Sequence, residues 1–135
     1  MDLMDSLAIS AAGMRVQGER LRVISENIAN ADSVSEVPGG DPYRRKTITF
    51  QNALDRELGA NLVKVKKVGL DPSEFTRKYD PSNPAADKSG YVKLPNVNAL
   101  IEMNDMREAQ RSYEANLKVI EVARGMLTRT IDLLR

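Results

Sequence analysis

Side chains that commonly perform catalysis are scarce in this chain. Its 135 residues include no His and no Cys, so the chain offers no imidazole as a base and no thiolate as a nucleophile or metal ligand. This excludes the Ser-His-Asp and Cys-His arrangements of nucleophilic catalysis, His-ligated zinc sites and disulfides. Carboxylate and amide side chains are left as the candidate chemical groups.

Three carboxylates in the middle of the chain, those of Asp71, Asp80 and Asp87, could in principle form an acid–base pair or a calcium site. Each lies in a turn-rich context, where an Asp side chain usually accepts hydrogen bonds from its own backbone. We therefore predict no catalytic residue, no metal site and no cofactor. A small carboxylate hydrolase is kept as the weakest alternative, since it would need a preformed pocket that joins two of these side chains.

Phosphate and nucleic acid are poor candidates as ligands. Gly39-Gly40 is followed by Asp41-Pro42 instead of a Lys at the start of a helix, so this segment is not a phosphate-binding loop. The formal charge of +1 provides no strong field toward a polyanion. The basic groups at 44–46 and 64–67 lack the clustered aromatic residues that stack on bases, and we interpret them as solvated strand edges.

Direct insertion into a membrane is not predicted. No apolar run approaches the roughly 18 residues that span a bilayer, and the first five residues carry Asp2 and Asp5 without a Lys or Arg. We therefore expect neither a membrane helix nor a cleavable signal peptide.

The elements that would position the remaining groups are two long helices, of which the C-terminal one has the stronger pattern. Apolar residues seven apart are Met106, Tyr113, Ile120, Leu127 and Leu134. The intermediate positions are filled by Ala109, Leu117, Ala123 and Ile131. The pattern predicts one helix within about 97–135 that carries a single apolar seam, with Asn98 as its N-cap.

A second heptad pattern lies at the N-terminus. Its apolar positions are Leu7, Met14, Leu21 and Ile28, and its alternate positions are the small residues Ala11, Gly18 and Ser25. A Gly inside a helix costs about 1 kcal/mol relative to Ala, so Gly18 favours close helix packing over the alternative of a loosely packed surface helix. Asn27 and Asn30 end this helix, and we expect one to cap it and the other to hydrogen-bond with neighbouring backbone.

Residues 33–96 are interrupted by turn dipeptides such as Asp80-Pro81 and Asn83-Pro84. We predict extended segments at 43–50, 62–68 and 91–94, and a short helix at 51–58 that ends at Gly59. The expected fold is mainly α with a small β-rich insertion, in which the terminal helices pack as an antiparallel coiled coil. Residues 1–32 and 97–135 would form one discontinuous coiled-coil domain, and 33–96 an irregular β-rich middle segment.

Several motifs along nearly the whole chain resemble those of the flagellar axial proteins, and within them of proximal rod subunits. The motifs are Ala8-Ile9-Ser10-Ala11-Ala12-Gly13-Met14, Asn27-Ile28-Ala29-Asn30-Ala31-Asp32-Ser33, Pro42-Tyr43-Arg44, Tyr79-Asp80-Pro81, Leu94-Pro95-Asn96-Val97-Asn98 and Arg111-Ser112-Tyr113-Glu114-Ala115-Asn116. Ser25-Glu26 departs from the Ala-Asn that is common in the wider family.

This resemblance implies a structural subunit of the bacterial flagellar basal body, without catalysis, that assembles helically into a rod crossing the periplasm and helps to transmit torque. It also implies export by the flagellar type III apparatus without a cleaved signal. The expected partners are further copies of the chain, other rod proteins and the adaptor between the rod and the membrane ring. An isolated subunit should be weakly folded, with ends that become ordered when neighbours supply the missing surfaces.

The residues expected at the assembly interface form two sets. The seam residues are Leu7, Met14, Leu21, Ile28, Met106, Tyr113, Ile120 and Leu127. The second set, expected to allow or hydrogen-bond close contacts, is Gly18, Asn27, Asn30, Asn96, Asn98 and Asn116. The main alternative is a soluble coiled-coil adaptor or export chaperone, which would be a stable dimer with fully helical ends in dilute solution.

Overall fold

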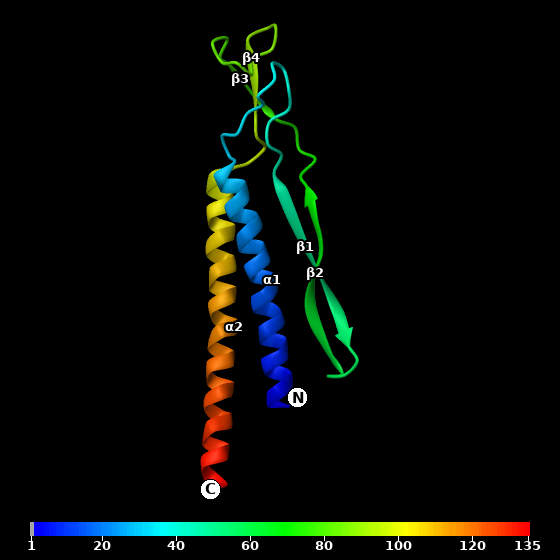
Figure 1. Cartoon of the computed structure of the whole chain (residues 1–135), viewed down its shortest axis with the longest axis vertical. Helices are drawn as coiled ribbons and strands as arrows, with labels where there is room; N and C mark the ends of the chain where they lie inside the picture. The colour runs from blue at the N-terminus through cyan, green and yellow to red at the C-terminus, as the bar shows by residue number, and fades with distance from the viewer. Residues whose placement is uncertain (1) are drawn as a thin grey trace. The chain divides into compact units, whose positions relative to one another are not determined.

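The computed structural model describes residues 2–135, and long helices form near both ends of the chain (Figure 1). The elements in order are α1 (Leu3–Ala29), β1 (Lys46–Asp55), β2 (Ala60–Leu70), β3 (Thr76–Tyr79), β4 (Tyr91–Leu94) and α2 (Ala99–Leu133). The two predicted helices and the small antiparallel β region between them are therefore confirmed.

The ends of the helices follow the predicted capping chemistry. The Oδ1 atom of Asn98 accepts hydrogen bonds from the backbone N–H groups of Leu100 at 3.1 Å and Ile101 at 3.4 Å, which confirms it as the N-cap of α2. Beyond the end of α1, the Nδ2 atom of Asn30 donates to the carbonyl oxygen of Glu26 at 2.9 Å. Two of the predicted asparagines thus satisfy backbone groups that a helix end leaves unpaired.

The segment at 51–58 is not a short helix, and this prediction was wrong. Residues 51–55 continue β1, which pairs with β2 in a two-stranded sheet. The Asp55 carboxylate accepts hydrogen bonds from the N–H groups of Glu57 and Leu58, and Gly59 has a positive φ of 64°. This turn chemistry and the pairing with β2 outweigh the helical spacing of Leu54 and Leu58.

Strands β3 and β4 form a second two-stranded sheet. They are antiparallel, with Arg77 opposite Lys93 and Tyr79 opposite Tyr91. The two tyrosine rings meet edge to face at 5.3 Å, and a Cβ on Gly90 would lie 2.9 Å from the Tyr79 ring. Strand β4 was predicted, whereas β3 was missed because its four residues are all exposed and show no apolar alternation.

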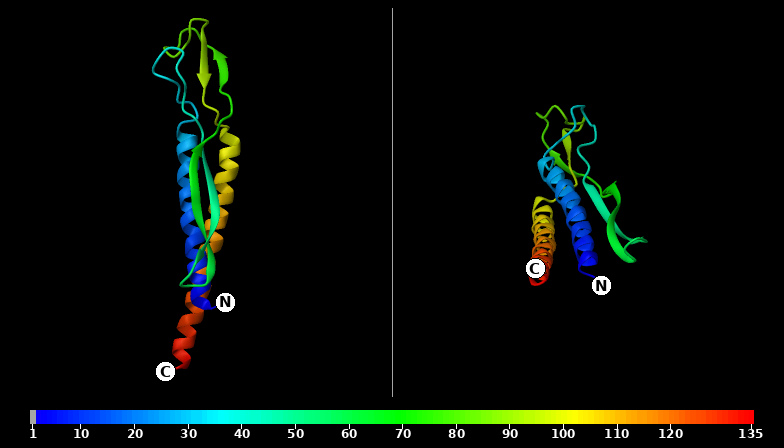
Figure 2. Two further views of the ribbon diagram at one scale, coloured as in Figure 1. Left: turned by 90° about the vertical axis from the view of Figure 1, so that its right-hand side faces the viewer. Right: turned by 60° about the horizontal axis from the view of Figure 1, so that its bottom comes forward.

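The chain folds as two compact units. Unit 1 consists of 2–21, 48–67 and 107–135, and unit 2 of 22–47 and 68–106. Within unit 1, the α1 segment lies between the β1–β2 segments and the α2 segment, as both Figure 1 and the right-hand view of Figure 2 show. The predicted division into 1–32 with 97–135, and 33–96, stays a prediction.

The buried residues of the two units differ in size and polarity. The buried apolar side chains of unit 1 include Ala12, Val16, Ala109 and Ala123, which are small. The largest fully buried side chains among the described residues, Glu102, Val23, Val92 and Asn27, all belong to unit 2. Unit 1 therefore has a thin apolar core, whereas unit 2 encloses polar groups as well as aliphatic ones.

Candidate functional site

In unit 1, Gly13 of α1 lies directly against Asn116 of α2. A Cβ built on Gly13 would lie 2.8 Å from the Asn116 Nδ2 atom, which donates to the carbonyl oxygen of Ser112 at 3.0 Å. The helices also share an exposed ion pair, in which Arg20 lies 3.5 Å from Glu108. Gly13, which the sequence analysis did not select, is thus the residue that permits the close approach.

The eight seam residues are all half-buried in the single chain. They are Leu7, Met14, Leu21, Ile28, Met106, Tyr113, Ile120 and Leu127. Between the seam positions of α2, a second row of residues seven apart consists of the buried Ala109, the half-buried Asn116 and the buried Ala123. Small and polar residues therefore occupy the centre of the contact. The six seam residues that lie in unit 1 flank this centre and keep part of their surface open.

Gly18 lies in open space, since no atom of residues 2–135 comes within 4 Å of a Cβ built there. It lines a groove of about 460 Å³ together with Ala11 and Met14 of α1 and Tyr113 and Ile120 of α2. We call this the first groove. Close packing at Gly18 is therefore not used within the chain, and its predicted role in contacts between subunits stays a prediction.

A second groove, of about 500 Å³, lies at another part of the same helix pair. Leu3 and Ser6 of α1 line it together with an apolar strip of α2 that includes Val119, Val122 and Met126. These three α2 side chains are 46%, 48% and 53% exposed. The helix pair of unit 1 thus leaves apolar surface uncovered in two separate grooves.

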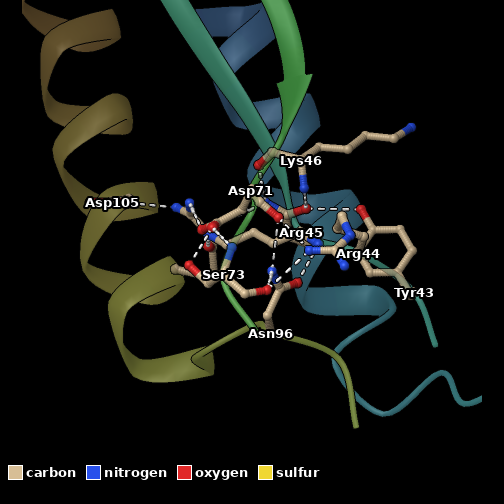
Figure 3. Close-up of polar contacts among 10 residues, drawn as sticks. Tyr43, Arg44, Arg45, Lys46, Asp71, Ser73, Asn96 and Asp105 are labelled. Carbon is tan, nitrogen blue, oxygen red and sulfur yellow. Dashed lines mark hydrogen bonds and ion pairs between the residues drawn. The ribbon is translucent and has the colours of Figure 1, made fainter. Parts of the chain in front are cut away.

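Unit 2 contains a polar junction, which we define as Asn27, Tyr43, Arg45, Lys46, Asp71, Asn96 and Glu102. Figure 3 labels Tyr43, Arg45, Lys46, Asp71 and Asn96. Its centre is Asn27, which is 1% exposed. The Asn27 Oδ1 atom accepts from the Lys46 N–H and the Tyr43 hydroxyl, both at 2.8 Å. The Nδ2 atom donates to the Lys46 carbonyl oxygen at 2.9 Å and to the Glu102 carboxylate at 3.4 Å. One amide side chain thereby joins the end of α1 to the start of β1 and of α2.

The carboxylate of Glu102 has no exposed surface and forms a close, hydrogen-bonded ion pair with the guanidinium of Arg45. Arg45 also pairs with Asp71 at 3.3 Å and Asp105 at 3.8 Å. Burial acts to lower the pKa of Arg45, but the hydrogen bond and charge of Glu102, reinforced by those of Asp71, outweigh it and leave that pKa raised. The buried charge of Glu102 is therefore compensated within the junction.

Asn96 connects two further segments to the junction. Its Oδ1 atom accepts from the Arg45 N–H at 2.7 Å, and its Nδ2 atom donates to the carbonyl oxygens of Asp71 at 3.1 Å and Ser73 at 3.2 Å. Asn27 and Asn96 were predicted from the sequence as interface residues, and the structure brings both into one cluster. Arg45 and Glu102 were not predicted, because they meet through a long-range contact that no local spacing in the sequence indicates.

No chemical site is formed by the carboxylates considered for catalysis. Asp71 accepts from the Ser73 N–H at 2.8 Å, and Asp87 accepts from the N–H groups of Ser89 at 2.8 Å and Tyr91 at 3.0 Å. These backbone N–H groups lower the pKa of Asp87. Among residues 2–135, no group of three or more acidic side chains is placed to hold a metal ion.

The comparisons with known proteins agree with one another. Residues 88–133 match the family model described as "Flagellar basal body rod FlgEFG protein C-terminal". A protein of Agrobacterium fabrum named "Flagellar basal-body rod protein FlgC" is 59% identical over 127 residues, which cover 94% of this chain and 91% of that protein. Proteins of the same name from Salmonella typhimurium and Bacillus subtilis are 39% and 36% identical, each covering 98% of this chain and at least 98% of its relative.

The relatives, which match nearly the full length of the chain, and the matched family model place it in the class of flagellar rod proteins. Within this class, the chain belongs to the family of flagellar basal-body rod proteins FlgC. The family is structural and not enzymatic, which confirms the prediction that the chain is not an enzyme.

Proposed function

We propose that this chain is a structural subunit of the proximal rod that joins its neighbours through the helix faces of unit 1. The helices would pack as an antiparallel coiled coil, assemble helically with other subunits and carry torque as load on many helix contacts. The observation that carries this proposal is the half-buried state of the six seam residues that lie in unit 1; the other two, Ile28 and Met106 of unit 2, are also half-buried. A surface that is apolar and only partly covered is typical of a site of protein association.

The order of the contacts within unit 1 supports the antiparallel arrangement. Gly13 lies beside Asn116, whereas Arg20, further along α1, pairs with Glu108, which is earlier in α2. The residue numbers rise on one helix as they fall on the other, at nearly equal steps. Such steps are expected for two helices of similar rise per residue that run in opposite directions.

The two grooves support open-ended assembly. They are lined by different residues, since Tyr113 and Ile120 face the first groove and Val119 and Val122 face the second. A subunit that meets its neighbours through two different surfaces forms heterologous contacts, which generate rings or helical filaments. A closed two-fold dimer would instead use one self-complementary surface, so the grooves favour a rod subunit over a dimeric adaptor or chaperone.

The C-terminal end of α2 adds a further apolar surface. Ile131, Leu133 and Leu134 are 54%, 86% and 83% exposed. Each such side chain, when fully buried, contributes roughly 1.5 to 3 kcal/mol. We propose that a neighbouring subunit covers this end of the helix in the assembled rod.

The location and partners follow from the same proposal. The family name of the relatives is that of a flagellar basal-body rod protein, and we propose that the chain assembles with other rod proteins and with the adaptor to the membrane ring after type III export. No helix among residues 2–135 is long and apolar enough to cross a bilayer. The terminal segments 1–32 and 97–135 would form the assembling domain, and 33–96 would make subunit-specific contacts.

Charged substitutions at the seam test this function. We expect Leu21→Asp or Ile120→Asp to leave export of the chain intact and to stop completion of the rod, because a buried unpaired carboxylate is costly in an apolar interface. Arg107→Asp, at an exposed position of α2, is the matched control and should preserve motility. Swimming cells that carry Leu21→Asp or Ile120→Asp would refute the assignment of the seam.

A further inference from the structure

A recess of about 330 Å³ in unit 2 brings three cations together outside the polar junction. The cations are Arg44, Arg77 and Lys93, and the carboxylates of Asp41 and Glu74 also line the recess. The helix contacts of unit 1 do not involve any of these residues. The proposed assembly through the seam therefore leaves this recess without a function.

Arg44 is held in a fixed position although no carboxylate pairs with it among the residues described. Its Nη1 atom donates to the carbonyl oxygens of Asp71 at 2.7 Å and Ser73 at 3.0 Å. Its guanidinium carbon lies 4.2 Å from the centre of the Phe75 ring. Carbonyl dipoles and an aromatic face stabilise the cation without neutralising it, so the guanidinium is preorganised and keeps its net charge.

Arg77 and Lys93 lie directly opposite each other on β3 and β4. Like charges at directly opposite positions destabilise a pair of strands. The Lys93 Nζ atom is drawn to Asp41 at 3.0 Å, whereas Arg77 has no ion pair within the described part of the chain and acts on Asp87 only at longer range. The repulsion is thus only partly relieved, and an additional anion in the recess would relieve it further.

We propose that this recess binds a carboxylate side chain from an acidic segment of a neighbouring polypeptide. A planar guanidinium can bind a carboxylate through two parallel hydrogen bonds, and both Arg44 and Arg77 are available for this. Three cations and two carboxylates leave the lining with a net charge of +1. That charge balances one carboxylate, but it falls short of a phosphate group with close to two negative charges.

This proposal adds to the proposed function the chemistry of a contact made by the middle of the chain. It rests on the proposed function only in taking the neighbouring polypeptide to be another rod subunit. Binding at the recess does not require the seam, because all its residues lie in unit 2. An experiment can therefore contradict carboxylate binding at the recess without contradicting assembly through the seam, and the reverse.

A peptide titration of the full chain tests the proposal. We expect a hexaglutamate peptide, added at constant ionic strength, to cause saturable shifts in the amide NMR signals of residues 44, 77 and 93. Arg77→Gln should weaken binding about tenfold, because it removes a charge-assisted hydrogen-bond donor. Glu74→Gln should tighten binding several-fold, because it removes a repelling carboxylate.

Lys88→Gln is the matched control, since Lys88 is an exposed lysine between β3 and β4 that does not line the recess. This variant should bind the peptide as the unchanged chain does, and all variants should keep the spectrum of a folded unit 2. The proposal is overturned if the shifts grow without saturation, if inorganic phosphate reproduces them, or if Arg77→Gln and Lys88→Gln have equal effects. Seam variants that lose motility but still bind the peptide would support the recess as a binding site that does not depend on the seam.

Discussion

The two units of this chain differ in the groups that they bury. Unit 2 buries a charged carboxylate and an amide, Glu102 and Asn27, and provides each with partners from the same unit. Unit 1 buries small residues such as Ala109 and leaves large ones such as Val122 and Met126 about half exposed. The buried polar groups of unit 2 therefore have their partners within the unit, whereas the helices of unit 1 keep apolar surface that a neighbour covers under our proposal.

The difference teaches how one small chain can be both a folded molecule and a part of a polymer. A buried polar cluster fixes one arrangement, because each unpaired member would be costly. Half-covered apolar faces tolerate exposure in the monomer and gain stability as neighbours bury them. The predictions below separate these two behaviours, beginning with the largest expected effect.

Breaking the ion pair of Arg45 and Glu102 should have the largest effect. Arg45→Met leaves the Glu102 carboxylate, which has no exposed surface, without its cation, and should lower the free energy of unfolding by about 3–5 kcal/mol. Urea unfolding of the purified chain measures this. Lys46→Met, which removes an ion pair with Glu26 whose side chains are 36% and 33% exposed, is the control and should cost about 1 kcal/mol or less.

The double variant Arg45→Met with Glu102→Leu sharpens this comparison. It removes the buried charge together with its partner, and should recover much of the stability that Arg45→Met loses. A double variant no more stable than Arg45→Met would show that the ion pair is not the main source of the loss.

Two glycines of α1 should respond differently to Ala. Gly18→Ala should stabilise the isolated chain by up to about 1 kcal/mol, because it improves helix propensity and meets no atom within 4 Å. Gly13→Ala should be less stable than Gly18→Ala by about 1–3 kcal/mol, because the new methyl group displaces Asn116. Thermal unfolding of the two variants measures this difference in stability, and equal stabilities would contradict the contact of Gly13 with Asn116. If Gly18 is used between subunits, Gly18→Ala should also reduce motility.

Acid should weaken unit 2 by a smaller amount. Hydrogen bonds from the Ser73 hydroxyl and N–H, with the charge of Arg45, hold the pKa of Asp71 below its ordinary value of 3.8. A carboxyl group with a lowered pKa in the folded state stabilises the fold above its unfolded pKa, and this contribution is lost as the pH falls through the folded pKa. We expect Asp71→Asn to lose less stability than the unchanged chain between pH 7 and pH 3 in urea unfolding. Equal losses in the two proteins would rule out this role for Asp71.

Much of the architecture could be predicted from the sequence, because it depends on local patterns. The heptads indicated α1 and α2, the chemistry of Asn98 indicated the start of α2, and the alternation of Val63 and Val65 with lysines indicated β2. The family relationship was also predictable, since its motifs lie along nearly the whole chain. Features that depend only on residues close together in the sequence could thus be predicted.

Contacts between distant segments could not be predicted in the same way. The seam pattern identified the large apolar residues but not the contact of Gly13 with Asn116, which is possible because Gly13 has no side chain. Arg45 was interpreted as part of a solvated strand edge, although it pairs with Glu102 at a separation of 57 residues. Long-range polar pairing leaves no periodic signal in the sequence.

Amide hydrogen exchange of the dilute, purified chain tests the central claim most directly. We expect slow exchange in the parts of unit 2 that hold the polar junction, and faster exchange in the α1 and α2 segments of unit 1 at 3–21 and 107–133, because these helices form in the single chain but open more often. The same helix segments should become protected in isolated basal bodies, where neighbours cover the seam. Uniform protection of both helices in the dilute chain would contradict the claim that assembly completes unit 1.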